Sequence, residues 1–121
     1  SRYAVDRLLV VFAAFARLAR EEADRCLSEP EIRSLEERIR NPDLWTIHRS
    51  FGHVTFMFHT DEQARASAAA GLREAYADLY FELLRKHDEF QYLRRSRFSV
   101  AFDSKENLDR NFGGSWFAYD R

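Results

Sequence analysis

The chain has 121 residues, of which 45% are hydrophobic, 15% aromatic and 32% charged, a composition that excludes a disordered chain. The 19 Lys and Arg residues nearly balance 20 Asp and Glu residues, so the net charge is −1, which argues against a protein that wraps duplex nucleic acid electrostatically. Two Pro and four Gly residues leave no flexible linker. We therefore expect one α+β domain over residues 1–121.

Apolar residues recur at helical spacing from Tyr3 to Leu27, which predicts a long amphipathic helix. The run from Leu8 to Ala16 superficially resembles a signal peptide, but Asp6 precedes it and the apolar pattern continues beyond it. The run is also far shorter than the roughly 20 residues needed to cross a bilayer, so we expect no membrane span. The wide apolar face predicts burial within the domain or, alternatively, a homodimer contact through this helix.

The single cysteine, Cys26, lies among the apolar positions of the first helix, and we expect it to be buried. One cysteine cannot form an internal disulfide, which favours a cytoplasmic location. The sequence contains no pair of cysteines at metal-binding spacing, no Gly-rich phosphate loop and no Gly-x-Ser-x-Gly motif. It therefore predicts no cofactor and no catalytic nucleophile.

A second helix is expected after Ser28, which has capping-box spacing with Glu31. A following Asn-Pro pair ends it, because the residue before proline is pushed out of the α region. Residues 43–51 then read as a connector that Trp45 and Ile47 anchor to the core.

Two segments, residues 52–59 and 97–103, alternate bulky apolar residues with other types and predict half-buried strands. We expect them to pair in a small antiparallel sheet of about three strands, with their aromatic faces packed against amphipathic helices. The apolar members are Val54, Phe56 and Phe58 in the first segment and Phe98, Val100 and Phe102 in the second.

Thr60 and Gln63 form another capping-box spacing and predict a helix that ends near Lys86 or His87. Gly71 lies within it and is expected to divide it, because a glycine inside a helix costs about 1 kcal/mol relative to alanine.

The closing segment carries a third predicted strand at residues 115–120, after a polar loop that ends in Gly113 and Gly114. Asp103 and Glu106 have capping spacing, which predicts a short helical turn in that loop. If the last strand is central, its aromatic residues belong to the core; if it is an edge strand, one aromatic face is left for a partner.

The histidines do not form a metal site by their spacing. His53 and His59 would lie about 20 Å apart on one strand, at roughly 3.3 Å per residue, so they cannot share an ion. They are expected to be exposed or hydrogen-bonded on the outer sheet face. Alternatively, they contribute with Asp103 to a ligand pocket between sheet and helices.

Acidic residues gather in the closing loop, at Asp103, Glu106 and Asp109, beside Asn111. Their spacing does not fit a calcium-binding loop, because the required glycine and terminal glutamate are absent. They are interpreted as capping and solvated residues or as an acidic binding edge.

Three arginines, Arg94, Arg95 and Arg97, interleave with Tyr92 and Phe98 in the manner of a small single-strand nucleic-acid or phosphate surface. The neutral overall charge favours a cluster that faces a protein partner or is merely solvated, and nucleic-acid binding is not expected.

The sequence DSKENLDRNFGGSWFAYDR, residues 103–121, resembles the C-terminal strand, polar loop and aromatic strand of some small bacterial immunity proteins from toxin and immunity pairs. The resemblance implies a small α+β protein that neutralises a partner by tight binding rather than by catalysis.

The leading prediction is therefore a non-enzymatic bacterial protein-binding domain. The alternatives are an enzyme or small-ligand-binding domain, with a pocket to which His53 and His59 contribute, and a structural module that dimerises through its first helix. The predicted partner surface comprises Arg94, Arg95, Arg97, Asp103, Glu106, Asp109 and Trp116.

Overall fold

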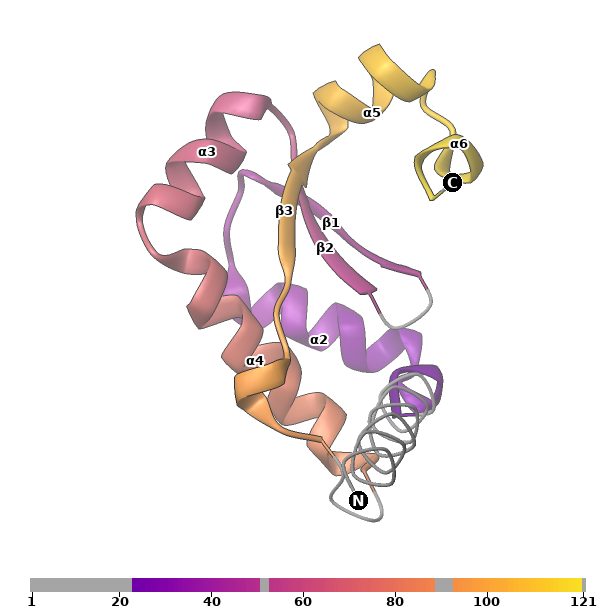
Figure 1. The fold of residues 1–121 in the computed structure, drawn as a ribbon. Coiled ribbons are helices and arrows are strands. Elements are labelled where there is room, and N and C mark those ends of the chain that lie inside the picture. Colours follow the sequence, from indigo (N-terminus) through magenta and orange to yellow (C-terminus); the bar gives the residue numbers. More distant parts are fainter. Residues whose placement is uncertain (1–22, 51–52, 89–92, 121) are drawn as a thin grey trace, which may run out of the picture.

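The computed structural model describes residues 23–50, 53–88 and 93–120, which form a three-stranded sheet with helices packed on it (Figure 1). The expected α+β class is confirmed. Residues 23–26 are helical, and the earlier part of the first predicted helix, with its dimer contact, lies outside the described residues. The elements are α2 (Glu29–Ile39), β1 (Leu44–Ser50), β2 (His53–Phe58), α3 (Asp61–Ala69), α4 (Leu72–Lys86), the 3-10 helix η1 (Arg95–Arg97), β3 (Ala101–Ser104), α5 (Lys105–Phe112) and α6 (Trp116–Tyr119).

The sheet has the order β1-β2-β3 and is mixed rather than antiparallel throughout. β1 and β2 pair antiparallel, as a short connection allows, whereas β2 and β3 pair parallel. The reason is the connection between β2 and β3, in which α3 and α4 return the chain to the starting end of the sheet.

The expected connector at residues 43–51 is instead the edge strand β1. Its register is shifted between Leu44 and Thr46, and this irregularity interrupts the alternation by which a strand is recognised. Ile47 lies opposite Phe56 and is buried, as expected. Trp45 does not join that core; it lies on the other face of the sheet, against α6.

One face of the sheet packs against α2, α3 and α4 and forms the core (Figure 1). Val54, Phe56 and Phe58 are at most 3% exposed, as their alternation predicts. The Phe56 ring lies 5.1 Å from that of Tyr76 and 6.0 Å from that of Phe102. The space between sheet and helices is thus filled by aromatic side chains.

Local signals located the helix ends. The capping boxes at Ser28 and Thr60 are present, and Gly71, at φ +79°, separates α3 from α4. The N-cap of α5 is Ser104 rather than Asp103, because the strand β3 extends to that residue.

Two further expectations were wrong. Residues 116–119 form the helix α6 and not a strand, because Gly113 and Gly114, both at positive φ, turn the chain back and Ser115 then caps a new helix. Cys26 is exposed rather than buried, because Ala23 and Leu27 occupy the inward positions of their turn.

No described helix combines the length and the apolar character that a membrane crossing requires.

Candidate functional site

The C-terminal platform, defined here as α5, α6 and the Gly113–Gly114 turn between them, lies at one end of the molecule and over the sheet face opposite α3 and α4 (Figure 1). Its main aromatic contact with β1 is a stack of three rings, those of Trp116, His48 and Trp45. The Trp116 ring lies 3.9 Å from that of His48, with 9° between their planes, and 5.8 Å from that of Trp45, with 10° between planes. Tyr119 meets Trp116 edge-on at 5.6 Å. Parallel and edge-on ring contacts of this kind fix α6 in position on β1.

Two hydrogen bonds add direction to this stacking. The Tyr119 hydroxyl donates to Oδ2 of Asp103 at 2.7 Å, and Nε2 of His48 lies 2.8 Å from Oδ1 of Asp120. Burial and the Asp103 carboxylate both raise the pKa of Tyr119. The phenol therefore remains a donor throughout the neutral range.

The Asp103 carboxylate is hydrogen-bonded to other residues of the protein. Its carboxylate also accepts two hydrogen bonds from Nδ2 of Asn107, at 3.0 and 3.1 Å. In the sheet Asp103 lies opposite Met57, which is fully buried. The carboxylate therefore joins β3, α5 and α6 rather than projecting toward solvent.

A second contact joins the platform to the start of α3. Asp61 accepts hydrogen bonds from the Ser104 hydroxyl and from Nη2 of Arg110, the latter at 2.8 Å. The Ser104 hydrogen bond, followed by that of Arg110, lowers the pKa of Asp61. Glu106 completes the junction by accepting the Asp61 backbone N–H at 3.2 Å.

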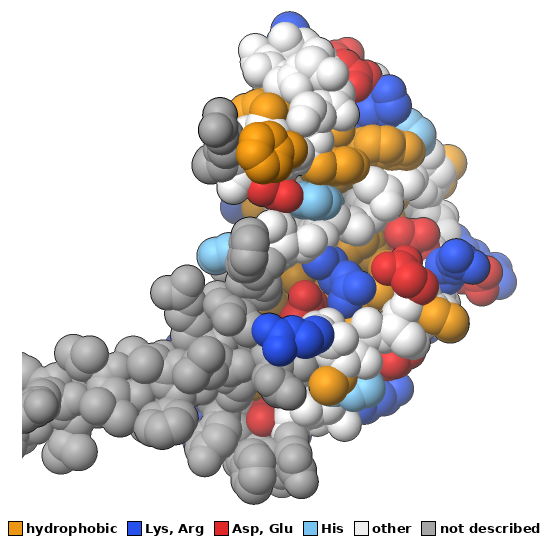
Figure 2. Space-filling model, turned by 90° about the vertical axis from the view of Figure 1, so that its right-hand side faces the viewer, with side chains coloured by type: hydrophobic (Ala, Val, Ile, Leu, Met, Phe, Trp, Pro, Cys, Tyr) orange, Lys and Arg blue, Asp and Glu red, His pale blue; other side chains and the backbone are white. Residues whose placement is uncertain are grey.

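The outward side of the platform presents one large apolar group and several charges. The Phe117 side chain is 74% exposed, and no other large hydrophobic side chain of the described residues is exposed to solvent to this degree. Glu106 and Asp109 are exposed on α5, where Asp109 pairs with Lys105 at 2.8 Å. Figure 2 shows hydrophobic side chains gathered at this end of the face, with charged groups beside them.

The predicted histidine pocket does not assemble. His53 and His59 are both exposed, at opposite ends of β2, and the space beneath the helices is filled. A more open cavity of about 440 Å³ lies along the edge of β1 instead. Arg49 lies in its wall, where it donates to the Asp24 carbonyl at 3.0 Å and approaches Glu29 at 3.6 Å.

Asp24, which also lines this cavity, belongs to a polar pair that reaches into the core. Asp24 is 8% exposed and accepts a hydrogen bond from the fully buried Tyr80 hydroxyl. Burial, followed by the charge of Asp24, raises the pKa of Tyr80. The pair satisfies both polar groups, so it is a structural element of the core.

The three arginines of the predicted partner surface lie at the opposite end of the molecule from the platform, around η1 (Figure 1). The Arg95 guanidinium donates three hydrogen bonds within the protein. Nε donates to Asp78 at 2.6 Å, Nη2 to Glu74 at 2.9 Å, and Nη1 to the Phe98 carbonyl at 2.9 Å. The Asp78 hydrogen bond in particular raises the pKa of Arg95. Arg94 and Arg97 are exposed.

The structure thus divides the predicted surface into two regions. Glu106, Asp109 and Trp116 belong to the platform, and Asp103 on β3 is hydrogen-bonded to it, whereas the arginines lie at the other end of the molecule. Sequence reasoning missed His48, Tyr119 and Asp120, which hold the platform in place. The sequence offered one indirect signal. Its two tryptophans, Trp45 and Trp116, stack on each other and so bring the segments that carry these residues together.

Groups of three or more His, Cys, Asp or Glu side chains that could hold a metal ion do not occur in the described part of the chain. No family model, curated protein or solved structure matches this chain significantly.

Proposed function

We propose that this protein is a non-enzymatic binding domain that engages a protein partner through the outward side of its C-terminal platform. The observation that carries the proposal is Phe117, an aromatic side chain 74% exposed on a helix that is itself fixed in place. Aromatic side chains are the commonest anchors of protein interfaces, and they bind best when they need not be ordered first.

The charges around Phe117 indicate what kind of partner fits. Asp109 is exposed on α5 close to the Gly113–Gly114 turn that leads to Phe117, and Glu106 is exposed in the first turn of the same helix, beside the start of α3. Lys105 is drawn toward Asp109 and lies 5.5 Å from the centre of the Trp45 ring. A partner with an apolar hollow bordered by basic residues would complement this surface.

The immunity-like interpretation belongs to this proposal as its most specific form: the partner would be a bacterial toxin that is neutralised by binding. The resemblance that suggested it rested on an aromatic strand at residues 115–120, and that segment is helical here. Support for the proposal therefore comes from the geometry of the platform.

The test is recovery of a partner from lysate of the native host with tagged protein. The variants are Phe117→Ser and the double charge reversal Glu106→Lys with Asp109→Lys. Arg38→Glu on α2, an exposed charge reversal away from the platform, is the matched control. A partner retained by the wild type and the control but reduced at least about tenfold by each platform change supports the proposal. Equal recovery with all four proteins contradicts it.

A further inference from the structure

An open cavity of about 370 Å³ lies between α3, the start of α4 and the turn that leads from α2 to β1, segments that run side by side in Figure 1. Its apolar lining comes from Ala66, Ala70 and Leu72. Its carboxylates are those of Asp43 and Glu62. Small side chains on α3 thus leave room for a ligand beside two acidic groups.

Hydrogen bonds within the protein form the walls of this cavity. Gln63 donates from Nε2 to Oδ1 of Asp43 at 3.1 Å, and its Oε1 accepts the backbone N–H of Thr60 at 3.1 Å. Asn41 donates from Nδ2 to the Tyr76 hydroxyl at 3.0 Å. These bonds hold the turn before β1 against both α3 and α4. The cavity is therefore formed before any ligand arrives, which lowers the entropic cost of binding.

One polar group in the lining is buried without a partner. Asp24, Ser67 and Ser104 are the buried polar or charged residues of the described ranges. Asp24 accepts a hydrogen bond from Tyr80, and Ser104 donates one to Asp61. Ser67, which is 7% exposed and lines the cavity, has no side-chain hydrogen bond with any described residue. Because burying an unpaired hydroxyl is unfavourable, this arrangement indicates that a ligand satisfies it.

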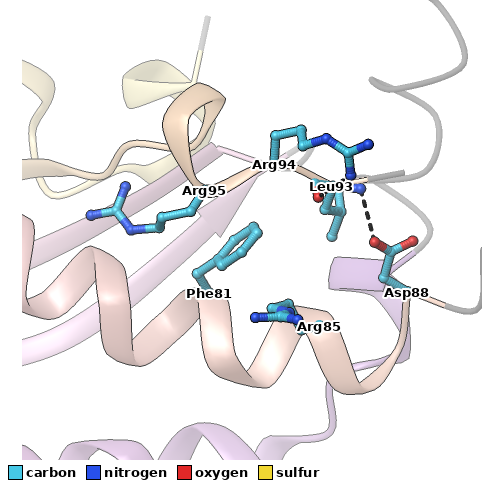
Figure 3. Close-up of a pocket in the computed structure, with 6 residues that line it drawn as sticks. All are labelled: Phe81, Arg85, Asp88, Leu93, Arg94 and Arg95. Atoms are coloured by element: carbon cyan, nitrogen blue, oxygen red, sulfur yellow. Dashed lines mark hydrogen bonds between the residues drawn. The ribbon is translucent and has the colours of Figure 1, made fainter. Parts of the chain in front are cut away.

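The cavity between the end of α4 and η1, of about 350 Å³, has no comparable group. The guanidinium groups of Arg94 and Arg95 point away from one another there, so they do not converge on one ligand (Figure 3). Asp88 has a structural role, because its Oδ2 accepts the backbone N–H of Leu93 at 2.8 Å (Figure 3). The cavity beside α3 is therefore the better candidate for a binding site.

The lining groups of the cavity beside α3 select the chemistry of the ligand. A primary ammonium group has three N–H donors and no acceptor. Asp43, Glu62 and Ser67 supply three acceptors from two segments, and the apolar lining suits an alkyl stem. Basic residues that are near in the sequence do not line the cavity; they are Arg40, Arg65 and Arg73. The preference for a cation thus comes from the lining itself.

We propose that the cavity between α3 and the turn before β1 binds a primary ammonium group on an alkyl stem, which Asp43, Glu62 and Ser67 accept as hydrogen-bond partners. The ammonium belongs either to a free alkylamine or to a lysine side chain of another protein. This site goes beyond the proposed function and shares no residue with the platform. The failure of either proposal therefore leaves the other standing.

The test is a titration of the full chain with n-butylammonium chloride, followed by backbone amide signals in nuclear magnetic resonance spectra. Sodium chloride at matched ionic strength accounts for general screening. Butyltrimethylammonium chloride has the same charge but no N–H donor, so it separates hydrogen bonding from charge attraction. A parallel titration uses Nα-acetyl-lysine methylamide. Tighter binding of this compound identifies a lysine side chain as the source, and tighter binding of n-butylammonium identifies a free amine.

The variants are Ser67→Ala and Glu62→Gln, with Glu37→Gln as the matched control, since Glu37 is exposed on α2 and does not line the cavity. We expect saturable shifts at Asp43, Ser67 and Ala70 with the wild type. Each cavity variant should weaken n-butylammonium binding about fivefold or more, and the control should retain it. Ser67→Ala removes an unpaired hydroxyl, so its thermal midpoint should not fall.

Four results would overturn the proposal. The first is the absence of saturable binding with both amines. The second is equal affinity for butyltrimethylammonium, which would indicate unspecific attraction of cations. The third is unchanged binding by Ser67→Ala, and the fourth is equal weakening by Glu37→Gln and Glu62→Gln. Far-UV circular dichroism checks that each variant is folded.

Discussion

The two ends of this molecule present side chains to solvent by different means. At the platform, stacked rings and short hydrogen bonds hold α6 on the sheet, and the exposed Phe117 follows from that placement. At η1, Arg95 with two carboxylate partners holds the chain against α4, and the buried Phe98 that follows η1 stacks on Tyr80. Ring stacking responds little to salt, whereas partly exposed ion pairs are screened by it. We therefore expect the contacts of the platform to depend little on salt, whereas salt should weaken the Arg95 contribution at η1.

The largest effect is expected from Trp116→Ala, which removes the ring stacked between Trp45 and His48. We expect a loss of about 2 kcal/mol in the free energy of unfolding, less than for a fully buried tryptophan because Trp116 is half-buried. Urea denaturation measures it. Phe117→Ala, one residue along, should change the free energy by no more than about 0.5 kcal/mol. Equal losses would mean that α6 is not held through Trp116.

Tyr119→Phe tests the directional part of the same support. Removing the hydroxyl deprives Asp103 of one donor, and we expect a loss of about 1 kcal/mol. A double-mutant cycle with Asp103→Ala separates this bond from the other contacts of each residue. A coupling energy indistinguishable from zero would show that stacking alone positions α6.

Arg95→Gln addresses the η1 end. Because its partners Glu74 and Asp78 are largely exposed, we expect a loss of only about 0.5 to 1 kcal/mol, and the loss should shrink as salt is raised. Arg97→Gln is the comparison, with no measurable loss expected. If the loss in free energy of unfolding caused by Arg95→Gln does not change with salt, the contrast between the two ends is wrong.

The smallest effect concerns pH and the contact between the platform and α3. The pKa of Asp61 is lowered in the folded protein, so its contribution to stability is fully present above its unfolded pKa. It is lost as the pH falls through the lower folded value. Wild type and Asp61→Asn should thus differ in free energy of unfolding at pH 6, and the difference should narrow below about pH 4. A difference that stays constant or widens toward acid would assign the contact to another group.

Half of the candidate site was within reach of sequence reasoning. Glu106, Asp109 and Trp116 were named because polar and aromatic residues in a Gly-ended loop suggest a binding edge. The residues that hold the platform on the sheet were not predicted, since His48 and Asp120 are 72 positions apart and no local pattern joins them. Grouping the arginines with the acidic loop was an inference from nearness in sequence, and the structure places them at the other end.

What the sequence by itself determined were the features that depend on near neighbours: the capping boxes at Ser28 and Thr60, the break at Gly71, and the buried alternation of β2. These follow from hydrogen bonds and side-chain directions within a few residues. The tertiary structure alone decided the rest. The crossover through α3 and α4 made β3 parallel to β2, and packing on Trp45 and His48 decided where α6, which the Gly113–Gly114 turn and the Ser115 cap begin, lies on the sheet. Both outcomes depend on contacts between distant parts of the chain, which local preference does not encode.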